Sequence, residues 1–347
     1  MHRRTLLAAA AATALMAPTA APAQDGPTVG MSWANYQEER WKIDEAGLRE
    51  GLAEIDGELI ATDAQSSVQK QASDVESLLA QGIDVLMVVA QDTDAIMPAV
   101  QRALNDGVPV IAYERQIEHP EVTYVAFDPV EVGRIQAREI VKAAPTGNYV
   151  IIKGSPTDQY THYVLEGQRE IIDPLIEAGD IEVVGEQFTD GWLPANAQRN
   201  MEQILTSNDN AVDAVLAAND GTAGGVVAAL RGAGLEGAVP VSGQDGDIAA
   251  LNRIAAGTQT VTAWKDAREL GRTAAQVAQA IVQGEDPADV DGAVSWDKGP
   301  KGIAQTAIVL APVTITRDNL DLVVDAGWIS VEDLCRGVSV EPPAACQ

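Results

Sequence analysis

The feature that most constrains this chain is a regular alternation of short apolar runs with longer amphipathic segments, beginning at residue 28. The short runs, such as VLMVVA at 85–90, have the length and composition of strands buried inside a sheet. The longer segments repeat apolar residues at helical spacing, as Val68, Val75 and Leu79 do. Strands that alternate with helices form parallel sheets covered on both faces, so the sequence predicts an α/β fold.

The alternation runs through the chain twice. The expected strands are 28–33, 58–64, 85–90, 109–113 and 123–128, then 148–154, 182–189, 214–218, 239–244, 260–264 and 307–312. The expected helices are 38–55, 68–79, 94–105, 160–177, 195–206, 221–233, 247–256 and 266–283. A chain of 347 residues is too long for one ordinary core, so the two halves predict two doubly wound lobes with parallel sheets.

The first 23 residues have the pattern of a secretory signal peptide. Arg3 and Arg4 precede a short apolar stretch that ends in Ala21-Pro22-Ala23, an A-x-A cleavage site. We therefore expect export with cleavage near Ala23, and the paired arginines leave both the Sec and the twin-arginine routes open. An uncleaved membrane anchor is the alternative, but the apolar stretch is short for a membrane span.

The charge balance argues against one class of partner. The chain has 51 Asp and Glu against 23 Lys and Arg, which gives a formal net charge of −28. Proteins that bind nucleic acid need a basic patch for its phosphates, so we expect no nucleic-acid partner.

The two cysteines, Cys335 and Cys346, both lie near the C-terminus. In an exported protein they can form a disulfide, and the small loop that it closes is worth roughly 3 kcal/mol on the chain-entropy model. Two free thiols in a frayed tail are the alternative.

Polar and aromatic side chains gather where the expected strands end. Ligands of open α/β sheets bind beyond the carboxyl ends of the strands, so these positions are candidate site residues. In chain order the candidates are Trp33, Arg40, Trp41, Glu114, Arg115, Gln159, Tyr160, Trp192, Asn219, Asp245 and Lys265. Planar polar groups pair with the closely spaced hydroxyls of a sugar, and an indole packs on the C–H face of the ring. The set therefore favours a sugar site, although each residue alone also fits a helix cap, a core position or a solvated loop.

The adjacent pair Glu114 and Arg115 follows the expected strand 109–113 directly. Successive side chains of a strand point to opposite sides, so both can face one cavity only if the chain turns there. We expect such a turn, with Arg115 donating to ligand oxygens and Glu114 accepting from a hydroxyl. The alternative is that only Arg115 faces the cleft and that Glu114 is solvated.

Motifs for catalysis and for metal binding are missing from the sequence. His119 and His162 lack metal-ligand spacing, and no G-x-S-x-G elbow or P-loop occurs. We therefore expect no catalytic residue, no metal site and no cofactor. A carboxylate pair of a secreted glycosidase is the enzymatic alternative, but nothing singles out such a pair.

Several stretches together resemble a known family. They are GMSWANYQEERWKID, SNDNAVDAVLAANDGTAGG, FTDGWLPANA, VSGQDGD and RIAAGTQTVTAWK. They look like the corresponding parts of D-xylose-binding proteins, the periplasmic sugar-binding components of ABC transporters. The resemblance covers nearly the whole chain after the signal peptide, and DGWLP, NDGTAGG and SGQD are its most specific parts. It implies the type I periplasmic binding protein fold, in which two lobes joined by three crossovers close on a sugar.

The resemblance also implies boundaries and roles. The lobes would be 25–127 with 266–312, and 128–265 with 313–347. The residues that would donate to or accept from sugar hydroxyls are Arg40, Arg115, Asn219, Asp245 and Lys265. Trp192 would stack on the sugar ring, and Trp41 would help to wall the pocket.

Two departures from the family pattern bear on which sugar is bound. Glu114 stands where the family has Asp, and the loop TDQYTH replaces one that contains Asn, so Gln159 or Tyr160 must replace that contact. D-xylose is the expected sugar, and another pentose or a hexose is the alternative.

The implied partners are a monosaccharide and an ABC permease in the inner membrane, with a chemoreceptor as an alternative partner. The resemblance also implies a monomer located in the periplasm, without enzymatic activity. The effector lobe of a transcriptional repressor shares this fold, but it would need an N-terminal DNA-binding helix pair where the signal peptide stands.

Overall fold

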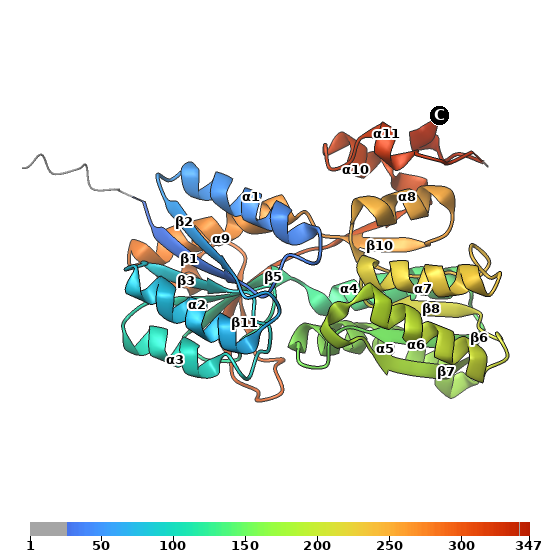
Figure 1. Cartoon of the computed structure of the whole chain (residues 1–347), viewed down its shortest axis with the longest axis horizontal. Helices are drawn as coiled ribbons and strands as arrows, with labels where there is room; N and C mark the ends of the chain where they lie inside the picture. The colour runs from blue at the N-terminus through green and yellow to red at the C-terminus, as the bar shows by residue number, and fades with distance from the viewer. Residues whose placement is uncertain (1–25, 340) are drawn as a thin grey trace, which may run out of the picture.

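The computed structural model describes residues 26–339 and 341–347 and shows two α/β lobes lying next to each other (Figure 1). The predicted fold class, two lobes built on largely parallel sheets covered by helices, is confirmed. The signal peptide expected at residues 1–23 lies outside the described residues. In the part of the chain that the structure describes, no helix is both long enough and apolar enough to cross a membrane.

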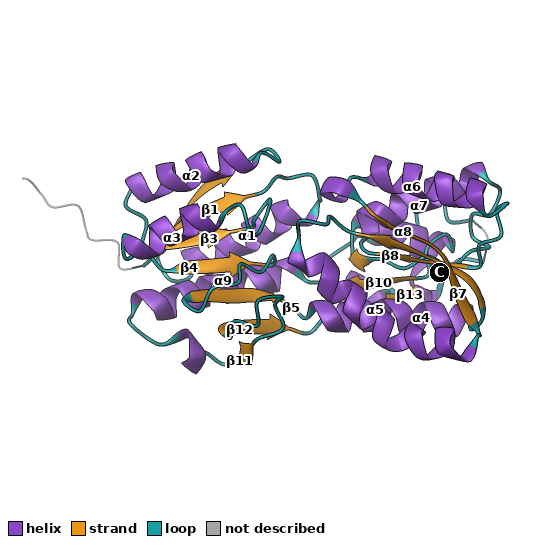
Figure 2. Ribbon diagram, turned by 90° about the horizontal axis from the view of Figure 1, so that it is seen from below, coloured by secondary structure: helices purple, strands orange, loops and turns teal. Residues whose placement is uncertain are grey.

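Lobe one is built on a seven-stranded sheet with the order β11-β12-β5-β4-β3-β1-β2 (Figure 2). The strands are β1 (Thr28–Trp33), β2 (Glu58–Asp63), β3 (Val85–Val88), β4 (Val110–Tyr113), β5 (Val122–Phe127), β11 (Ala293–Trp296) and β12 (Gln305–Leu310). The helices are α1 (Arg40–Ala53), α2 (Val68–Ala80), α3 (Met97–Asn105) and α9 (Ala267–Val282).

Helices cover both faces of this sheet, which explains the continuous apolar runs of its central strands. On β3, Val85 and Met87 pack with α1 and α9 on one face, whereas Leu86 and Val88 pack with α2 and α3 on the other. Successive residues of a strand alternate between faces, so a strand that is buried on both faces must be apolar throughout.

Lobe two holds two three-stranded sheets, β7-β6-β8 and β13-β10-β9, linked by a bridge between Val215 and Val241. The strands are β6 (Gly147–Lys153), β7 (Ile181–Phe188), β8 (Ala214–Ala217), β9 (Gln244–Asp245), β10 (Val261–Trp264) and β13 (Val313–Thr316). The helices are α4 (Pro129–Ala143), α5 (Gln159–Ala178), α6 (Pro194–Ser207), α7 (Asp220–Gly232) and α8 (Ile248–Ala256). Helices α4 and α5 pack on one face, and α6 and α7 on the other.

The C-terminal segment packs on α8 of lobe two, where Leu320 and Leu334 join the core around Leu251. It contains the short helices α10 (Asp321–Asp325) and α11 (Val331–Leu334). Four 3₁₀ helices lie in the described residues, η1 (Asp190–Trp192), η2 (Pro287–Asp289), η3 (Arg317–Asn319) and η4 (Ala344–Cys346). Cys335 and Cys346 form a disulfide, so the alternative of two free thiols does not hold in this structure.

Within the described residues the chain passes between the lobes at three places, from β5 to α4, from β10 to α9 and from β12 to β13. We propose to place the lobe boundaries at these passages, which keeps the division into 25–127 with 266–312 and 128–265 with 313–347. Three connections that run side by side allow two lobes to move relative to each other as rigid bodies.

The structure corrects the expected elements in three respects. Helix α4 is missing from the expected set, although Asp128 caps it and Pro129 occupies its first turn. The strand expected at 239–244 is reduced to the bridge at Val241 and to β9, which begins at Gln244. Pro240 has no N–H to donate, so regular pairing does not begin before Val241. Strands β11 and β13, which were not expected, pair antiparallel with their neighbours, so neither lobe is wholly parallel.

Candidate functional site

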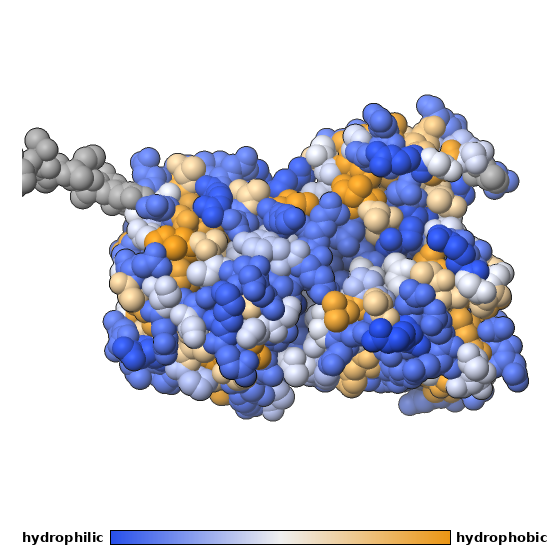
Figure 3. Space-filling model, viewed as in Figure 1, coloured by the Kyte–Doolittle hydropathy of each residue, from blue (hydrophilic) through white to orange (hydrophobic). Residues whose placement is uncertain are grey.

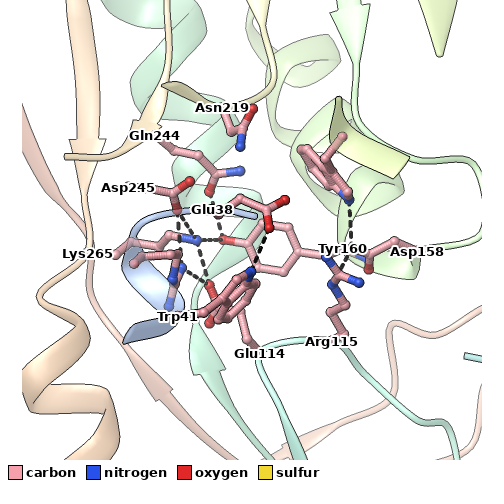
Figure 4. A pocket seen from close by; sticks show the side chains of 12 residues that line it. Glu38, Trp41, Glu114, Arg115, Asp158, Tyr160, Asn219, Gln244, Asp245 and Lys265 are labelled. Carbon is pink, nitrogen blue, oxygen red and sulfur yellow. Dashed lines mark hydrogen bonds and ion pairs between the residues drawn. The ribbon is translucent and has the colours of Figure 1, made fainter. Parts of the chain in front are cut away.

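A cavity lies between the two lobes, at the carboxyl ends of their strands (Figure 4). The space among its side chains measures about 310 Å³, including space that opens to solvent, which is small for a site that binds a small molecule. Lobe one supplies Glu38, Arg40, Trp41, Glu114 and Arg115. Lobe two supplies Asp158, Tyr160, Trp192, Asn219, Gln244 and Asp245, and Lys265 follows β10 at the passage to α9. Figure 3 shows a furrow between the lobes that is bordered mainly by hydrophilic residues.

The chain turns at Glu114, as the prediction for the adjacent pair requires. Glu114 has a φ of +59°, and the Arg115 N–H donates to the carbonyl of Tyr113 at 2.6 Å. The turn brings both side chains into the cavity lining, and only 3% of the Glu114 surface is exposed. The alternative of a solvated Glu114 is therefore wrong. A left-handed backbone costs a residue with a Cβ about 1–2 kcal/mol, and such strain is concentrated at functional sites.

Glu114 belongs to a buried ionic network with Arg40, Asp245 and Lys265. Arg40 Nη1 lies 2.6 Å from Glu114 Oε1 and 3.1 Å from Asp245 Oδ1. Lys265 Nζ lies 2.5 Å and 2.9 Å from the same two oxygens. Burial alone would raise the pKa of both carboxyls, but Arg40 and Lys265 hold the pKa of each below its ordinary value. Glu114 and Asp245 are therefore ionised at neutral pH.

Arg40 is oriented from behind by Asp44, one helical turn further along α1. Arg40 Nε and Nη2 donate to the two Asp44 oxygens at 2.9 Å and 3.2 Å, and the Tyr113 hydroxyl donates to the same carboxylate at 2.6 Å. Two parallel bonds fix the plane of a guanidinium group. Arg40 therefore presents Nη1 to the cavity in a fixed direction.

A second ion pair crosses the cleft on the other side of the cavity. Arg115 Nε lies 3.1 Å from Asp158 Oδ2, and Arg115 Nη1 donates to the carbonyl of Ala90 at 2.9 Å. Trp192 Nε1 donates to the same Asp158 oxygen at 3.2 Å. Burial raises the pKa of the Asp158 carboxyl, and the Arg115 charge offsets only part of that rise. Asp158 thus joins a guanidinium of lobe one to an indole of lobe two.

Two indoles wall the cavity, one from each lobe. The Trp41 ring centroid lies 4.7 Å from the Arg40 guanidinium carbon, and Trp41 Nε1 donates to Glu38 at 2.7 Å. The Trp192 ring covers Gly154, where a Cβ would come within 2.1 Å of the indole. Glycine at position 154 is therefore what lets Trp192 lie flat against the strand end.

Asn219 serves as a helix cap and as a lining residue at the same time. Its Oδ1 accepts from the Thr222 N–H at 2.9 Å, and Thr222 Oγ1 accepts from the Asn219 N–H at 3.0 Å, which forms a capping box at the start of α7. Because the oxygen is used by the cap, the Nδ2 group is turned to the cavity (Figure 4). Asn219 can therefore cap α7 and contact a ligand at the same time.

The structure brings nine of the eleven predicted site residues to the cavity, and Trp33 and Gln159 are the exceptions. Trp33 is fully buried at the end of β1 and packs against Trp41 and Tyr113, so it supports the wall from behind. Gln159 starts α5 directly before Tyr160, and neighbouring helical residues point about 100° apart, so only Tyr160 faces the cavity.

Three lining residues were not predicted, namely Glu38, Asp158 and Gln244. Asp158 and Gln244 stand next to predicted residues at strand ends, and Asp158 occupies the N-cap of α5. A rule that includes the cap residue after each strand would have found Asp158. Glu38 precedes α1, and no local pattern marks its side chain as part of the cavity lining.

Two α/β lobes with three connections and a polar cavity between them define a two-lobed binding protein, in which a ligand is enclosed between the lobes. The sequence matches the periplasmic binding protein domain over residues 29–286, and the chain belongs to that family. The members of this family bind and deliver solutes, so the glycosidase alternative is wrong.

Named relatives match nearly the whole chain. It is 36% identical to the D-xylose-binding periplasmic protein of Escherichia coli over 309 residues. This match covers 88% of this chain and 92% of the relative. The D-xylose-binding periplasmic protein of Haemophilus influenzae is 34% identical and covers 88% of this chain and 91% of its own. A carbohydrate transporter solute-binding protein from Chloroflexus aurantiacus, solved in complex with D-glucose, has a TM-score of 0.81 and 30% identity, over 88% of this chain and 97% of its own.

Proposed function

We propose that this protein is the exported receptor of an ABC sugar importer and that it binds one monosaccharide, D-xylose, in the cavity between its lobes. The observation that carries the proposal is one cavity in which two indoles accompany buried carboxylates, cations and carboxamides contributed by both lobes. This combination suits the alternating polar and C–H surfaces of a sugar ring.

The pairing of the cations favours an uncharged ligand. Arg40 and Lys265 both contact Glu114 and Asp245, and Arg115 contacts Asp158. A phosphate or carboxylate ligand would need a cation that has no carboxylate partner. Each of the three cations that line the cavity already has a carboxylate partner. A hydroxyl both donates and accepts, so it can accept from the cation of a pair and donate to its carboxylate.

Such contacts are strong enough for a transport receptor. Hydrogen bonds to charged groups contribute about 1.5–3 kcal/mol each. Micromolar affinity corresponds to about −8 kcal/mol, which several such bonds and one stacked indole can supply. The net free energy of binding is a difference, because each hydrogen bond from a sugar hydroxyl replaces part of an ion-pair contact that exists in the sugar-free protein.

The names of the relatives support D-xylose as the ligand, since two of them are D-xylose-binding proteins at 34–36% identity. A multiple sugar-binding receptor of Rhizobium radiobacter is 30% identical, and the structural relative from Chloroflexus aurantiacus holds D-glucose. Another pentose or a hexose is therefore the second candidate, and Glu114 in place of the family's Asp is the residue that favours it.

The proposed setting is the periplasm, which the signal-peptide pattern at residues 1–23 and the periplasmic relatives support. In this setting the closed, loaded monomer would present one continuous surface to an ABC permease in the inner membrane. A chemoreceptor that reads the same closed form is the alternative partner.

Isothermal titration of the mature chain with D-xylose, L-arabinose, D-ribose and D-glucose tests the proposal. We expect saturable binding of one sugar per chain, with D-xylose the tightest. Binding of a different monosaccharide would overturn the choice of D-xylose, and no binding of any sugar would overturn the receptor role. Incubation with aryl glycosides serves as the control, and turnover would contradict a pure binding protein.

A further inference from the structure

Tyr160 lies in the middle of the cavity and is fixed at both of its ends (Figure 4). Its N–H donates to Asp158 Oδ1 at 3.0 Å in the first turn of α5. Its hydroxyl donates to Gln244 Oε1 at 3.0 Å and accepts from Lys265 Nζ at 3.2 Å. The backbone bond fixes the residue at the helix start, and the side chain cannot swing aside without losing the two bonds of its hydroxyl.

The ring of Tyr160 divides the cavity into two sides. Lys265, Asp245 and Gln244 lie on the side of its hydroxyl, whereas Arg115 and Asp158 lie on the other side (Figure 4). The Lys265 ammonium is 4.7 Å from the ring centroid, so the ring also covers the charged side of the site. A sugar that reaches both sides must pass beside this ring, and an extra substituent on the sugar competes with it for space.

The hydroxyl of Tyr160 also decides what Gln244 offers to a ligand. Because Gln244 Oε1 accepts from the phenol, the Nε2 group is the part of the carboxamide left for a ligand. Within the described residues, Gln244 Nε2 has no hydrogen-bond acceptor in the protein. Gln244 therefore acts as a donor of fixed direction, and Tyr160 sets that direction.

We propose that Tyr160 determines the specificity of the site, because its ring excludes the hydroxymethyl group of a hexose and its hydroxyl aims Gln244 at the sugar. The inference rests on the proposed sugar-binding function and adds which sugars the cavity rejects. D-xylose and D-glucose share the configuration of their ring hydroxyls, and D-glucose differs only by the hydroxymethyl group on C5. The two sugars therefore isolate the group that the ring of Tyr160 would exclude.

The test is titration of D-xylose and D-glucose into wild type, Tyr160→Ala, Tyr160→Leu and Tyr160→Phe. We expect the wild type to prefer D-xylose by about tenfold or more, the scale on which one small group is discriminated in a pocket. Tyr160→Ala and Tyr160→Leu remove the ring, so the ratio of the two dissociation constants should move toward one. Tyr160→Phe keeps the ring, so it should keep the preference while weakening both sugars, because Gln244 loses its orienting bond.

Tyr163→Phe is the matched control, since Tyr163 lies on the same helix and its hydroxyl bonds Gln116 outside the cavity lining. It should leave the preference unchanged. A wild type that binds both sugars equally, or ring-removing variants that lose both sugars in the same proportion, would overturn the role of Tyr160 and leave sugar binding standing. A wild type that binds neither sugar would overturn the proposed function itself. Tyr160→Leu carries the test if thermal unfolding shows that Tyr160→Ala is not folded.

Discussion

In the two Arg–Asp pairs that cross the cavity, the two lobes contribute opposite charges. Lobe one contributes the guanidinium groups of Arg40 and Arg115, and lobe two contributes the carboxylates of Asp245 and Asp158 that face them, each pair at 3.1 Å. Arg40 is held from behind by Asp44, whereas Asp158 is held as the N-cap of α5. The two lobes therefore meet through the same charged groups that a ligand would contact.

A ligand in this cavity must therefore share these pairs rather than fill an apolar pocket. A buried ion pair gives little net stability, but removal of one partner leaves an uncompensated charge and costs about 3–5 kcal/mol. A variant that removes the cation of a pair across the cleft should consequently have a larger effect than a variant that removes apolar surface.

The largest effect is expected for Arg115→Ala. This change removes a charged donor to the ligand, so sugar binding should lose about 1.5–3 kcal/mol for each hydrogen bond that the guanidinium makes and become nearly undetectable. It also leaves Asp158 buried without its cation, which should lower the stability of the protein. Arg102→Ala, which breaks an exposed pair with Asp106, is the control and should leave the affinity unchanged. If titration gives Arg115→Ala an affinity within a few-fold of wild type, the ion pairs across the cleft do not carry binding.

Trp192→Ala should have the next largest effect. Loss of a stacked indole should weaken sugar binding by about 1–3 kcal/mol, by analogy with aromatic stacking on other ring-shaped ligands. The fold should survive, because thermal unfolding of the sugar-free protein depends on cores that Trp192 does not join. Leu193→Ala changes the exposed neighbour and serves as the control. Unchanged affinity of Trp192→Ala by calorimetry would remove the indole from the proposed contacts.

Variants of Glu114 should change selectivity more than affinity. Glu114→Gln keeps an acceptor but removes the charge that faces Arg40 and Lys265, so binding should weaken moderately. Glu114→Asp restores the residue expected from the family pattern and should shift selectivity toward D-xylose if another sugar is preferred. Titration of both variants and the wild type with D-xylose, D-glucose, L-arabinose and D-ribose measures the change in selectivity. Identical affinities for all three proteins would show that the Glu114 carboxylate does not contact the sugar.

The smallest expected effect is on the pH dependence of stability. The folded-state pKa of Glu114 lies below its ordinary value of 4.5, because Arg40 and Lys265 outweigh burial. Its stabilising contribution is therefore present above about pH 4.5 and is lost as the pH falls through the lowered pKa. Asp158, whose pKa burial raises, acts in the opposite direction, because protonation at falling pH favours the folded form.

Melting temperatures between about pH 3 and pH 7 separate the two contributions. Glu114→Gln should flatten the loss of stability on the acid side. Asp158→Asn should lower stability overall, because it leaves Arg115 without its carboxylate, but it should also remove the decline that ionisation of Asp158 causes as the pH rises. Parallel curves for wild type and Glu114→Gln would contradict the lowered pKa of Glu114.

Much of the fold could be predicted from the sequence because strands buried on both faces must be apolar throughout, as β3 is. The alternation missed α4 even though Asp128 and Pro129 mark its start. It overestimated the strand at 239–244, of which only the bridge at Val241 and the start of β9 at Gln244 are formed. Edge strands such as β11 are half exposed and short, so their sequences carry too weak a pattern to be recognised.

The candidate site could be predicted as a set of strand ends, but the roles of individual side chains could not. Trp33 and Trp41 have the same residue type, and only packing decides that Trp33 lies behind the cavity wall and Trp41 in it. Asp158 has the pattern of an ordinary helix cap, and its bonds to Arg115 and Trp192 depend on how the lobes meet.

Small-angle X-ray scattering of the mature protein, with and without its tightest-binding sugar, shows whether the two lobes close on the ligand. We propose that the lobes enclose a monosaccharide by moving about the three passages near Asp128, Asp266 and Val313. We predict a smaller radius of gyration when the site is saturated with the sugar. An identical scattering profile, at a sugar concentration that calorimetry shows to be saturating, would contradict closure of the two lobes around the ligand.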